Sequence, residues 1–370
     1  MANQLRTNPP FRAEHIGSLL RPVELMDAFK RQARHELDDA ALRELQDRAI
    51  VAAIRMQEEA GFESISDGEF RRSSWAYGFV EAIEGFVNRP SPWPFHDAEG
   101  RTYPIETCYA VKPIRRTRGI ATGEFEFVRA HTERTPKVTI PSPSFMHFFQ
   151  AGRCADPTVY PEPDGFWEDL LRIYVEEIAA LGRLGVKWLQ IDEVPQAMLC
   201  DPKIRDQITS FGEDPERLTG KYIEAVNRIV RPRPPGMVIG MHLCRGNFRS
   251  RWLAAGGYEA VAERLFNECA VDGFFLEYDD PRAGGFEPLR FMPKHKFAVL
   301  GLVSTKTPVL EARSAIHRRI DEAAKFAALE QLALSPQCGF ASTVGGNLLS
   351  ADDQKAKLQL VVETANEIWF

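Results

Sequence analysis

Short runs of apolar and β-branched residues recur along the chain, and each run has the length of a buried strand. The stretches between successive runs are long enough for a crossover helix. This alternation predicts parallel strands that are joined by helices. The eight runs span residues 14–19, 64–69, 137–145, 188–193, 238–244, 274–278, 297–304 and 332–340.

Apolar residues at helical spacing predict amphipathic helices in the stretches between these runs. Acidic residues stand where two of the helices begin, at 213–216 and 350–353, and negative charge is favourable at a helix N-terminus. The predicted helices span residues 39–60, 166–184, 215–230, 258–269, 311–332 and 352–368.

Eight strand and helix units predict an α/β fold in which a single (β/α)8 TIM barrel occupies residues 1–370 as one domain. The length of 370 residues alone would also fit two domains, and the alternation favours one barrel. Residues 88–135 interrupt the rhythm, since they are rich in proline, arginine and aromatic residues and include the alternating stretch Glu124-Phe-Glu-Phe-Val128. We expect a β-hairpin insertion over the barrel mouth there.

Composition narrows the classes of function. Hydrophobic residues make up 44% and charged residues 26% of the chain, which excludes a disordered, collagen-like or disulfide-scaffold protein. The net charge of −6 is spread over mixed signs, so no electrostatic footprint for nucleic acid or an anionic membrane is present. We therefore expect small-molecule partners and neither nucleic acid nor membrane, with a homo-oligomer left open.

The chain also indicates a compartment. Its first residues lack the apolar region of a secretion signal, and no uncharged apolar run reaches about 18 residues. Six cysteines are scattered too widely for a disulfide framework in a chain of this size. These features predict a cytoplasmic protein with reduced thiols, some of which are free to bind a metal.

Candidate chemistry gathers where the predicted strands end, which is where barrel enzymes place their sites. His242 and Cys244 stand two apart in a strand and so face the same side. Glu277 and Cys338 end two further strands and add ligands toward a tetrahedral set. Mixed thiolate, imidazole and carboxylate ligands favour zinc. The alternative is that both thiols are small buried hydrophobes and that His242 is a core histidine.

Several motifs carry a resemblance to a known family. They are Ala13-Glu-His-Ile-Gly-Ser18, Ser66-Asp-Gly-Glu-Phe-Arg71, Gln190-Ile-Asp-Glu193, Met241-His-Leu-Cys244 and Leu334-Ser-Pro-Gln-Cys-Gly-Phe340. With this spacing the chain resembles the catalytic C-terminal barrel of the cobalamin-independent methionine synthase family. The resemblance implies zinc ligands at His242, Cys244, Glu277 and Cys338, and homocysteine-binding positions at Ile16, Gly17, Ser18, Glu69 and Asp192.

The implied pocket has a physical rationale. Ser18 and the backbone of Gly17 can donate hydrogen bonds to a small carboxylate, while Glu69 and Asp192 are acceptors suited to an ammonium group. The alternative is that either carboxylate pairs with an arginine such as Arg71 or Arg72, or caps the following helix.

The resemblance implies a zinc-dependent methyltransferase of methionine biosynthesis, related to 5-methyltetrahydropteroyltriglutamate–homocysteine S-methyltransferase. Zn²⁺ would hold the thiol of homocysteine as a thiolate near neutral pH, and the thiolate would attack a methyl group to give methionine. Two cysteine thiolates and a carboxylate keep the bound sulfur nucleophilic, with Glu277 as the ligand that yields to the substrate.

The chain departs from the family in two respects. Full-length members carry a second, N-terminal barrel that helps to hold the methyl-folate, and 370 residues leave no room for it, so the donor could be a folate, a corrinoid or another compound. Lys306 stands where the full-length pattern has a proton-donating histidine. Lys306 is therefore a candidate catalytic acid, or else binds an anion or pairs with Glu311. His15 is a further candidate for acid–base work, with a core role as its alternative.

Two other functions remain open. One is an enzyme of the epoxyalkane:coenzyme M transferase type, whose sulfonate could be bound by Arg71, Arg72, Arg245 or Lys306. The other is a non-catalytic accessory barrel with a structural zinc. Trp75, Phe145, His147 and Phe148 follow or end strands and could flank a flat donor, although packing is the more frequent role of large rings.

Overall fold

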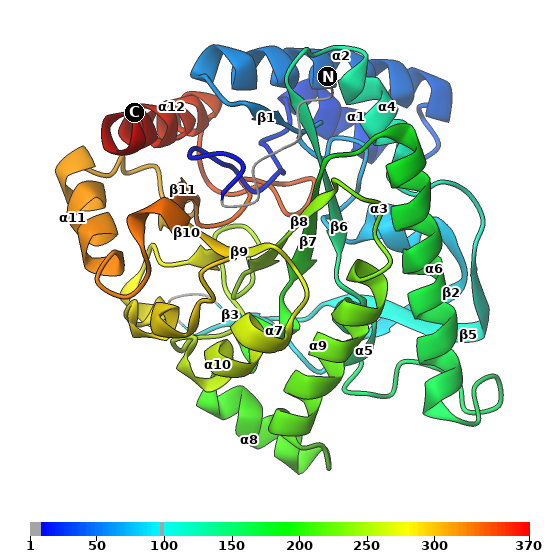
Figure 1. The fold of residues 1–370 in the computed structure, drawn as a ribbon. Coiled ribbons are helices and arrows are strands. Elements are labelled where there is room, and N and C mark those ends of the chain that lie inside the picture. Colours follow the sequence, from blue (N-terminus) through cyan, green and yellow to red (C-terminus); the bar gives the residue numbers. More distant parts are fainter. Residues whose placement is uncertain (1–8, 97–99) are drawn as a thin grey trace.

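A parallel sheet forms the centre of the molecule (Figure 1). The computed structural model describes residues 9–96 and 100–370. Seven strands pair in sequence order, each parallel to its neighbour, and the two-strand antiparallel additions lie outside this sheet. The strands are β1 (Ser64–Ile65), β6 (Thr135–Pro141), β7 (Trp188–Glu193), β8 (Val238–Leu243), β9 (Gly273–Glu277), β10 (Phe297–Val303) and β11 (Leu332–Pro336).

The strands predicted over 64–69, 137–145 and 332–340 end earlier than expected, at Ile65, Pro141 and Pro336. The first predicted strand is absent. Residues 14–19 form no strand, and their segment contributes an isolated parallel bridge between Ala13 and Leu334 of β11. The prediction was wrong because Gly17 has a φ of 131°, which turns the chain out of the extended conformation. The segment still lies between the two ends of the sheet, since the amide of Glu14 donates to Leu334 and that of Leu19 donates to Gly68 beyond β1. The curled sheet is consistent with a TIM-like barrel.

Helices surround the sheet, as Figure 1 shows. The predictions for 39–60 and 215–230 match α2 and α9 at both ends, where Asp38 and Asp214 accept hydrogen bonds from the first turn. The helix predicted over 311–332 is shorter and is followed by the 3-10 turn η3 (Leu329–Gln331). The principal helices are α1 (Val23–Ala33), α2 (Asp39–Ala60), α6 (Pro163–Leu184), α8 (Pro202–Ser210), α9 (Pro215–Val230), α10 (Glu259–Glu268), α11 (Arg313–Ala323) and α12 (Ala351–Trp369).

Four shorter helices and two 3-10 turns complete the described helical structure. Two of the short helices, α5 and α7, directly follow strands β6 and β7 and so lie at the carboxyl edge of the sheet. They are α3 (Tyr77–Val80), α4 (Thr122–Arg129), α5 (Pro143–Phe148), α7 (Pro195–Met198), η1 (Pro281–Ala283) and η2 (Glu287–Phe291).

The segment 88–135 is not a single hairpin. An antiparallel ladder pairs β2 (Ile83–Pro90) with β5 (Glu106–Arg116), and a smaller one pairs β3 (Phe95–His96) with β4 (Thr102–Tyr103). Residues 97–99, within the expected insertion, lie outside the described residues. The stretch 124–128 belongs to helix α4, so its reading as a strand was wrong. Phe125 and Val128 are three apart and both buried, which places them on one face of a helix.

The interior of the sheet holds apolar side chains around one ion pair. Trp188, Phe275 and Phe297 are fully buried in one cluster. Within the same interior, Nζ of Lys137 donates a hydrogen bond to Oε2 of Glu14 at a distance of 2.9 Å, and both side chains are at most 1% exposed.

All six cysteines are buried and unpaired. Within the described residues no helix combines the length and apolar character needed to cross a membrane.

Candidate active site

Polar side chains meet where neighbouring parallel strands end. Asp192 on β7 lies directly opposite His242 on β8 in the register, and Glu277 is the last residue of β9. Cys244 follows β8 by one residue and Cys338 follows β11 by two. Because all these strands run parallel, their carboxyl ends bring the five residues to one edge of the sheet.

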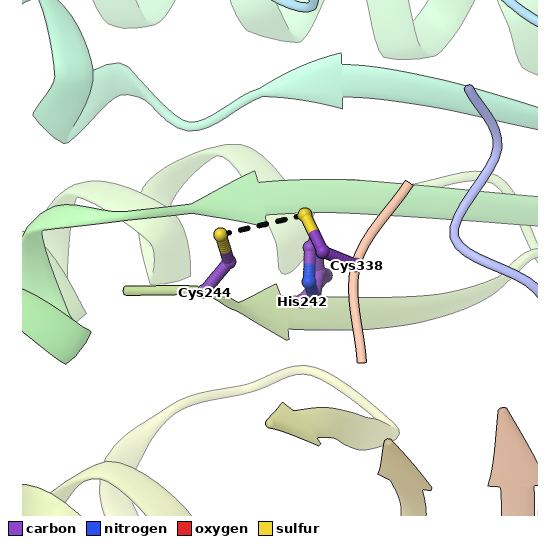
Figure 2. Close-up of side chains that lie close together, drawn as sticks. All are labelled: His242, Cys244 and Cys338. Carbon is purple, nitrogen blue, oxygen red and sulfur yellow. Dashed lines mark hydrogen bonds between the residues drawn. The ribbon is translucent and has the colours of Figure 1, made fainter. Parts of the chain in front are cut away.

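Three of the predicted metal ligands come together (Figure 2). One ligand atom from each of His242, Cys244 and Cys338 lies within 4.8 Å of the other two, and all three residues are buried. The two Sγ atoms are 3.5 Å apart. The hydrogen bond with Cys338, together with burial, raises the pKa of the Cys244 thiol well above its ordinary value. A positive charge is therefore needed between the sulfurs if both are to be thiolates near neutral pH.

The ring of His242 is oriented for coordination. Its Nδ1 lies 3.0 Å from Oδ1 of Asp192, while the buried Nε2 has no hydrogen-bond partner. Burial lowers the pKa of His242, but the hydrogen bond and charge of Asp192 outweigh burial and raise it. A carboxylate on one nitrogen with the other nitrogen free is the arrangement that proteins use to present histidine to a metal. The residues present therefore fit a thiophilic metal ion such as Zn²⁺.

Glu277 lies beside this group but its carboxylate is engaged elsewhere. Oε2 accepts a hydrogen bond from the backbone amide of Arg245 at 2.8 Å, and Oε1 lies 3.0 Å from the guanidinium of Arg282 and 3.6 Å from Nζ of Lys306. Burial raises its pKa, but Lys306, Arg245 and Arg282 outweigh burial and hold the pKa at about 2. Glu277 is therefore an ionised carboxylate within a cluster of cations, and it lies outside the group of three described above.

A cavity of about 930 Å³, including its opening to solvent, extends from His242, Cys244 and Cys338 to the surface. Several predicted site residues line it, whereas Gly17, Glu277, Lys306 and His15 do not. The predicted residues that line it are Ile16, Ser18, Glu69, Asp192, His242, Cys244 and Cys338.

Glu69 lines this cavity and has one carboxylate oxygen without a hydrogen-bond partner. Its Oε1 accepts a hydrogen bond from Thr139 at 2.9 Å and lies 3.8 Å from Arg72, whereas the buried Oε2 has no partner. Burial, with further contributions from Asp192 and Asp67, outweighs the attraction of Arg72 and raises the pKa of Glu69 to about 7. An unpartnered buried carboxylate oxygen is an acceptor that a water or a ligand can satisfy.

Ser18 lines the cavity, and Gly17 lies directly before it, beside Glu69 and Thr139. A Cβ on Gly17 would lie 2.8 Å from Cγ2 of Thr139, and its φ of 131° strains any side chain. The hydroxyl of Ser18 accepts a hydrogen bond from the amide of Ala341, and a Cβ on Gly339 would lie 1.9 Å from that hydroxyl. Both glycines are therefore required by close approach of the N-terminal segment to its neighbours.

The two candidate acid–base residues lie away from the cavity. His15 contacts the ring of Phe62 edge-on and its Nε2 lies 3.1 Å from the carbonyl of Ser64. Burial and the charge of Lys137 hold the pKa of His15 well below its ordinary value, so it is neutral. Lys306 is buried against Glu277. Burial lowers the pKa of Lys306, but Glu277 and Asp279 outweigh burial and raise it.

The aromatic candidates divide into two groups. Trp75 and Phe145 line the cavity and contact each other edge-on with centroids 4.9 Å apart. His147 and Phe148 pack elsewhere, against Tyr222. Nδ1 of His147 lies 2.9 Å from the Tyr222 hydroxyl, and burial and Lys221 lower the pKa of His147 to about 3. His147 and Phe148 are therefore packing residues.

The four cations proposed for a sulfonate have other partners. Arg71 and Arg72 lie 2.6 Å from Asp47 and Glu124 respectively. Arg245 donates to the hydroxyl of Tyr258 and the carbonyl of Glu277. None of these four cations lines the cavity, and in the part of the chain that the structure describes no other lysine or arginine lines it either. The geometry gives no support to an anionic sulfonate pocket.

Two residues of the cavity lining, Asn247 and Glu106, and one residue behind it, Thr139, were not found by the sequence analysis. Asn247 donates to the carbonyl of Gly339 at 2.8 Å and so ties the loop after β8 to the loop that carries Cys338. Thr139 supports Glu69, and Glu106 stands at the opening. The position of Asn247 three residues after Cys244 was the one available signal, whereas Thr139 and Glu106 carry no local pattern.

Comparisons with known proteins identify relatives of this chain. No family model matches it. The uncharacterized protein YxjH of Bacillus subtilis is 40% identical over 97% of this chain and 95% of its own length. A methionine synthase of Pyrococcus abyssi is 27% identical over 88% of this chain and 84% of its own. A solved structure from Listeria monocytogenes, assigned as a vitamin-B12-independent methionine synthase, is 32% identical over the whole of both chains with a TM-score of 0.75.

A curled parallel sheet with a buried histidine and two cysteines at its carboxyl edge, in a chain with these relatives, defines a methyltransferase, an enzyme that transfers one-carbon groups. The relatives cover nearly the full length of this chain and of their own. The chain belongs to the cobalamin-independent methionine synthase family. The resemblance and the enzyme class inferred from the sequence are confirmed.

Proposed function

We propose that this protein is a zinc-dependent methyltransferase that converts homocysteine to methionine. The observation that carries the proposal is the free Nε2 of His242 beside two sulfurs that lie 3.5 Å apart. This set matches the ligands that Zn²⁺ prefers, and it opens into a cavity that also contains free acceptors. Relatives named methionine synthase support the same reaction.

His242, Cys244 and Cys338 would hold the metal, with Glu277 as a fourth ligand. When bound, Zn²⁺ would hold the acceptor thiol as a thiolate near neutral pH. Asp192 fixes the ring of His242 and favours the tautomer that leaves Nε2 available. Arg282 and Lys306 hold the carboxylate of Glu277 beside the site, so its approach to the metal would be a reversible exchange between these cations and the ion.

The amino-acid part of homocysteine would lie between two walls of the cavity. Glu69 and Asp192 accept hydrogen bonds from the ammonium group, and Oε2 of Glu69 is free to do so. The hydroxyl of Ser18 binds the carboxylate, with Ile16 packing beside it, and Gly17 lets the chain approach its neighbours closely between them. These contacts orient the thiol toward the two cysteines and the histidine.

The fold proposed for this function is a complete barrel. The segment before β1 would close the sheet, because it hydrogen-bonds to β11 on one side and to the residues after β1 on the other. The β2–β5 ladder would cover the opening of the barrel, because Glu106 and Thr107 of β5 line the cavity. Six reduced cysteines support a cytoplasmic enzyme that works on small molecules.

Metal analysis combined with zinc X-ray absorption tests the proposal. We expect about one zinc per chain, and one additional sulfur in its shell after homocysteine is added. The Cys338→Ser variant should lose most of its zinc and all methyl transfer, because one of the two sulfurs is removed. Cys154→Ser removes another buried thiol and should retain both properties. Zinc and activity retained in Cys338→Ser would refute the ligand set.

A further inference from the structure

Side chains hold the N-terminal segment that carries Ser18, where a strand would have used a backbone ladder. Three consecutive carbonyls, those of residues 15–17, each accept a hydrogen bond from a buried side chain. Lys137 donates to the first of them, Gln190 to the second at 2.7 Å, and Ser66 to the third at 2.7 Å. The place of Ser18 in the cavity therefore depends on these side chains as well as on backbone pairing.

Gln190 differs from the other two donors because it also reaches the metal side of the site. It is fully buried on β7 and stands two residues before Asp192, so both side chains lie on the same face of the strand. Its Nε2 donates to the carbonyl of Ile16 and to Oδ1 of Asp192, each at 2.7 Å, and its Oε1 accepts from Nζ of Lys137 at 3.3 Å. A carbonyl and a carboxylate only accept and an ammonium group only donates, so these partners fix the orientation of the amide.

Asp192 divides its two oxygens between separate tasks. Oδ1 accepts from Gln190 at 2.7 Å and lies 3.0 Å from Nδ1 of His242. Within the described residues Oδ2 accepts no hydrogen bond, and Asp192 lines the cavity. The hydrogen bond from Gln190 therefore fixes which oxygen serves His242 and which oxygen is left for a ligand.

A neutral amide at this position keeps two charges apart. The buried Lys137 already pairs with Glu14 at 2.9 Å. Gln190 accepts from Lys137 at one end and donates to Asp192 at the other, so it links them without a charge of its own. A lysine in its place would pair with Asp192 and take up the negative charge that attracts an ammonium group, whereas a glutamate could not donate to Asp192.

We infer that Gln190 is a positioning residue that sets the carboxylate of Asp192 at a fixed distance from the segment 16–18. It thereby aligns three groups at once: the ring of His242, the acceptor for the substrate ammonium group on Asp192, and the hydroxyl of Ser18 that receives the substrate carboxylate. Gln190 itself does not line the cavity, so it acts through these neighbours. The inference rests on the proposed function, because it concerns how the same site recognises an α-amino acid that carries a thiol.

A double-mutant cycle on zinc affinity tests the link to the metal side. Zinc dissociation constants are measured for the full chain by competition with a chelator. Gln190→Met keeps the length of the side chain and removes its hydrogen bonds, and we expect zinc to bind about tenfold more weakly, as when a group that orients a ligand is lost. In an Asp192→Ala background the same change should alter the affinity less than about twofold, because the effect passes through Asp192. An equal effect in both backgrounds, or none in either, would overturn the inference.

Gln331→Met is the matched control. Gln331 is a buried glutamine whose Nε2 donates to the carbonyls of Pro293 and Lys296 at 2.9 and 2.8 Å, and it lies outside the cavity lining. Its substitution should lower stability without altering zinc affinity, and a loss of affinity equal to that of Gln190→Met would also reject the inference. Gln190→Glu has nearly the same shape but cannot donate, so it should weaken zinc binding as well, and it takes the place of Gln190→Met if near-UV circular dichroism shows that variant to be unfolded.

Truncated thiols test the alignment of the two ends of the substrate. 4-Mercaptobutyrate lacks the ammonium group of homocysteine, and 3-aminopropane-1-thiol lacks its carboxylate. In titration calorimetry with zinc-saturated protein, the native chain should prefer homocysteine to both thiols. Gln190→Met should reduce each preference about tenfold, because the two binding groups no longer have a fixed spacing. Gln331→Met should keep the native preferences, and native preferences in Gln190→Met would contradict the inference.

The two proposals fail in different ways. If the native protein binds no zinc, or if Cys338→Ser retains it, the proposed function fails and the inference fails with it. If Cys338→Ser loses zinc and homocysteine adds a sulfur to the zinc shell of the native protein, but Gln190→Met keeps the native affinity and preferences, the role of Gln190 alone is rejected.

Discussion

Glu69, which lines the cavity, has a backbone φ of 60°. Few residues other than glycine adopt this left-handed conformation. Such a conformation costs about 1–3 kcal/mol and persists where neighbouring contacts enforce it. Here Oδ1 of Asp67 accepts from the amide of Glu69 at 2.8 Å, and Arg21 donates to its carbonyl at 2.7 Å. Backbone strain of this kind gathers at functional sites, in keeping with the place of Glu69 in the cavity lining.

The titration of Glu69 gives a pH prediction. Its pKa of about 7 is set by burial, by Asp192 and Asp67, and by the opposing charge of Arg72. Only the ionised form attracts an ammonium group, so protonation below the pKa weakens substrate binding. We expect KM for homocysteine to rise about tenfold between pH 8 and pH 6, as a single titration near 7 requires.

Steady-state kinetics of Glu69→Gln provides the control. This variant should have a raised KM at pH 8 and should lose the component of pH dependence that belongs to Glu69. The metal content should stay unchanged, because Glu69 lies outside the ligand group. An unaltered KM profile in Glu69→Gln would contradict the role of this carboxylate.

Gly17 gives a second prediction at this scale. Gly17→Ala would place a methyl group 2.8 Å from Thr139 in a strained conformation, at an expected cost of about 1–3 kcal/mol in the free energy of unfolding. KM for homocysteine should also rise, since Cβ would lie 3.1 Å from Oε1 of Glu69. Denaturant unfolding and kinetics measure both effects. Gly345→Ala is the matched control, because its Cβ meets nothing within 4 Å, and an equal loss in both variants would refute the explanation.

Residue patterns found part of the candidate site. The two-residue spacing of His242 and Cys244 was visible because both belong to one strand end. The place of Glu106 in the cavity could not be predicted from the sequence. Glu106 lies in the β2–β5 ladder, outside the main sheet, and it lines the cavity only because that ladder packs there. The ion pairs of Glu277 with Arg282 and Lys306 were missed for a similar reason, since they join separate loops.

At the scale of elements, regular periodicity predicted bounds well. The strand predicted over 188–193 coincides with β7, and the helix over 39–60 coincides with α2. Both have continuous patterns and clear ends. Alternation misled at 124–128, where two buried residues three apart formed one face of a helix. The prediction of a strand over residues 14–19 was wrong because Gly17 turns the chain, and a run of apolar residues does not reveal such a turn.

Helix α12 provides a prediction for an element. Ser350 and Asp353 form a capping box in which each side chain accepts a hydrogen bond from the backbone of the other. Ser350→Ala removes one of these bonds and should lower the free energy of unfolding by ~1 kcal/mol. Thermal unfolding measures the change. Ser210→Ala, at an exposed serine near the end of α8, should be close to neutral, and similar losses in the two variants would argue against capping.

At the scale of the whole molecule, one ion pair links both ends of the sheet. Glu14 belongs to the segment beside β11, Lys137 lies on β6, and Trp188 on β7 donates to Glu14 at 3.0 Å. Lys137→Met leaves Glu14 as an unpaired buried carboxylate, and we expect a loss of ~3–5 kcal/mol in the free energy of unfolding.

Chemical denaturation of two variants tests this pair. Lys355→Met breaks an exposed pair with Glu59 and should cost less than about 1 kcal/mol. The double variant Glu14→Gln with Lys137→Met should recover part of the loss, because no buried charge is left without a partner. A cost for Lys137→Met as small as that for Lys355→Met would show that the buried pair does not hold the sheet together.

The sequence by itself determined the α/β alternation, the family, and three of the four residues proposed as metal ligands that come together in space, because periodicity and motif spacing can be read directly along the chain. Only the tertiary structure decided the ion pairs of Glu277, the unpartnered oxygen of Glu69 and which described residues line the cavity. Burial, charge pairing and unmet hydrogen bonds depend on which distant side chains meet, and that is settled when the strands and loops pack.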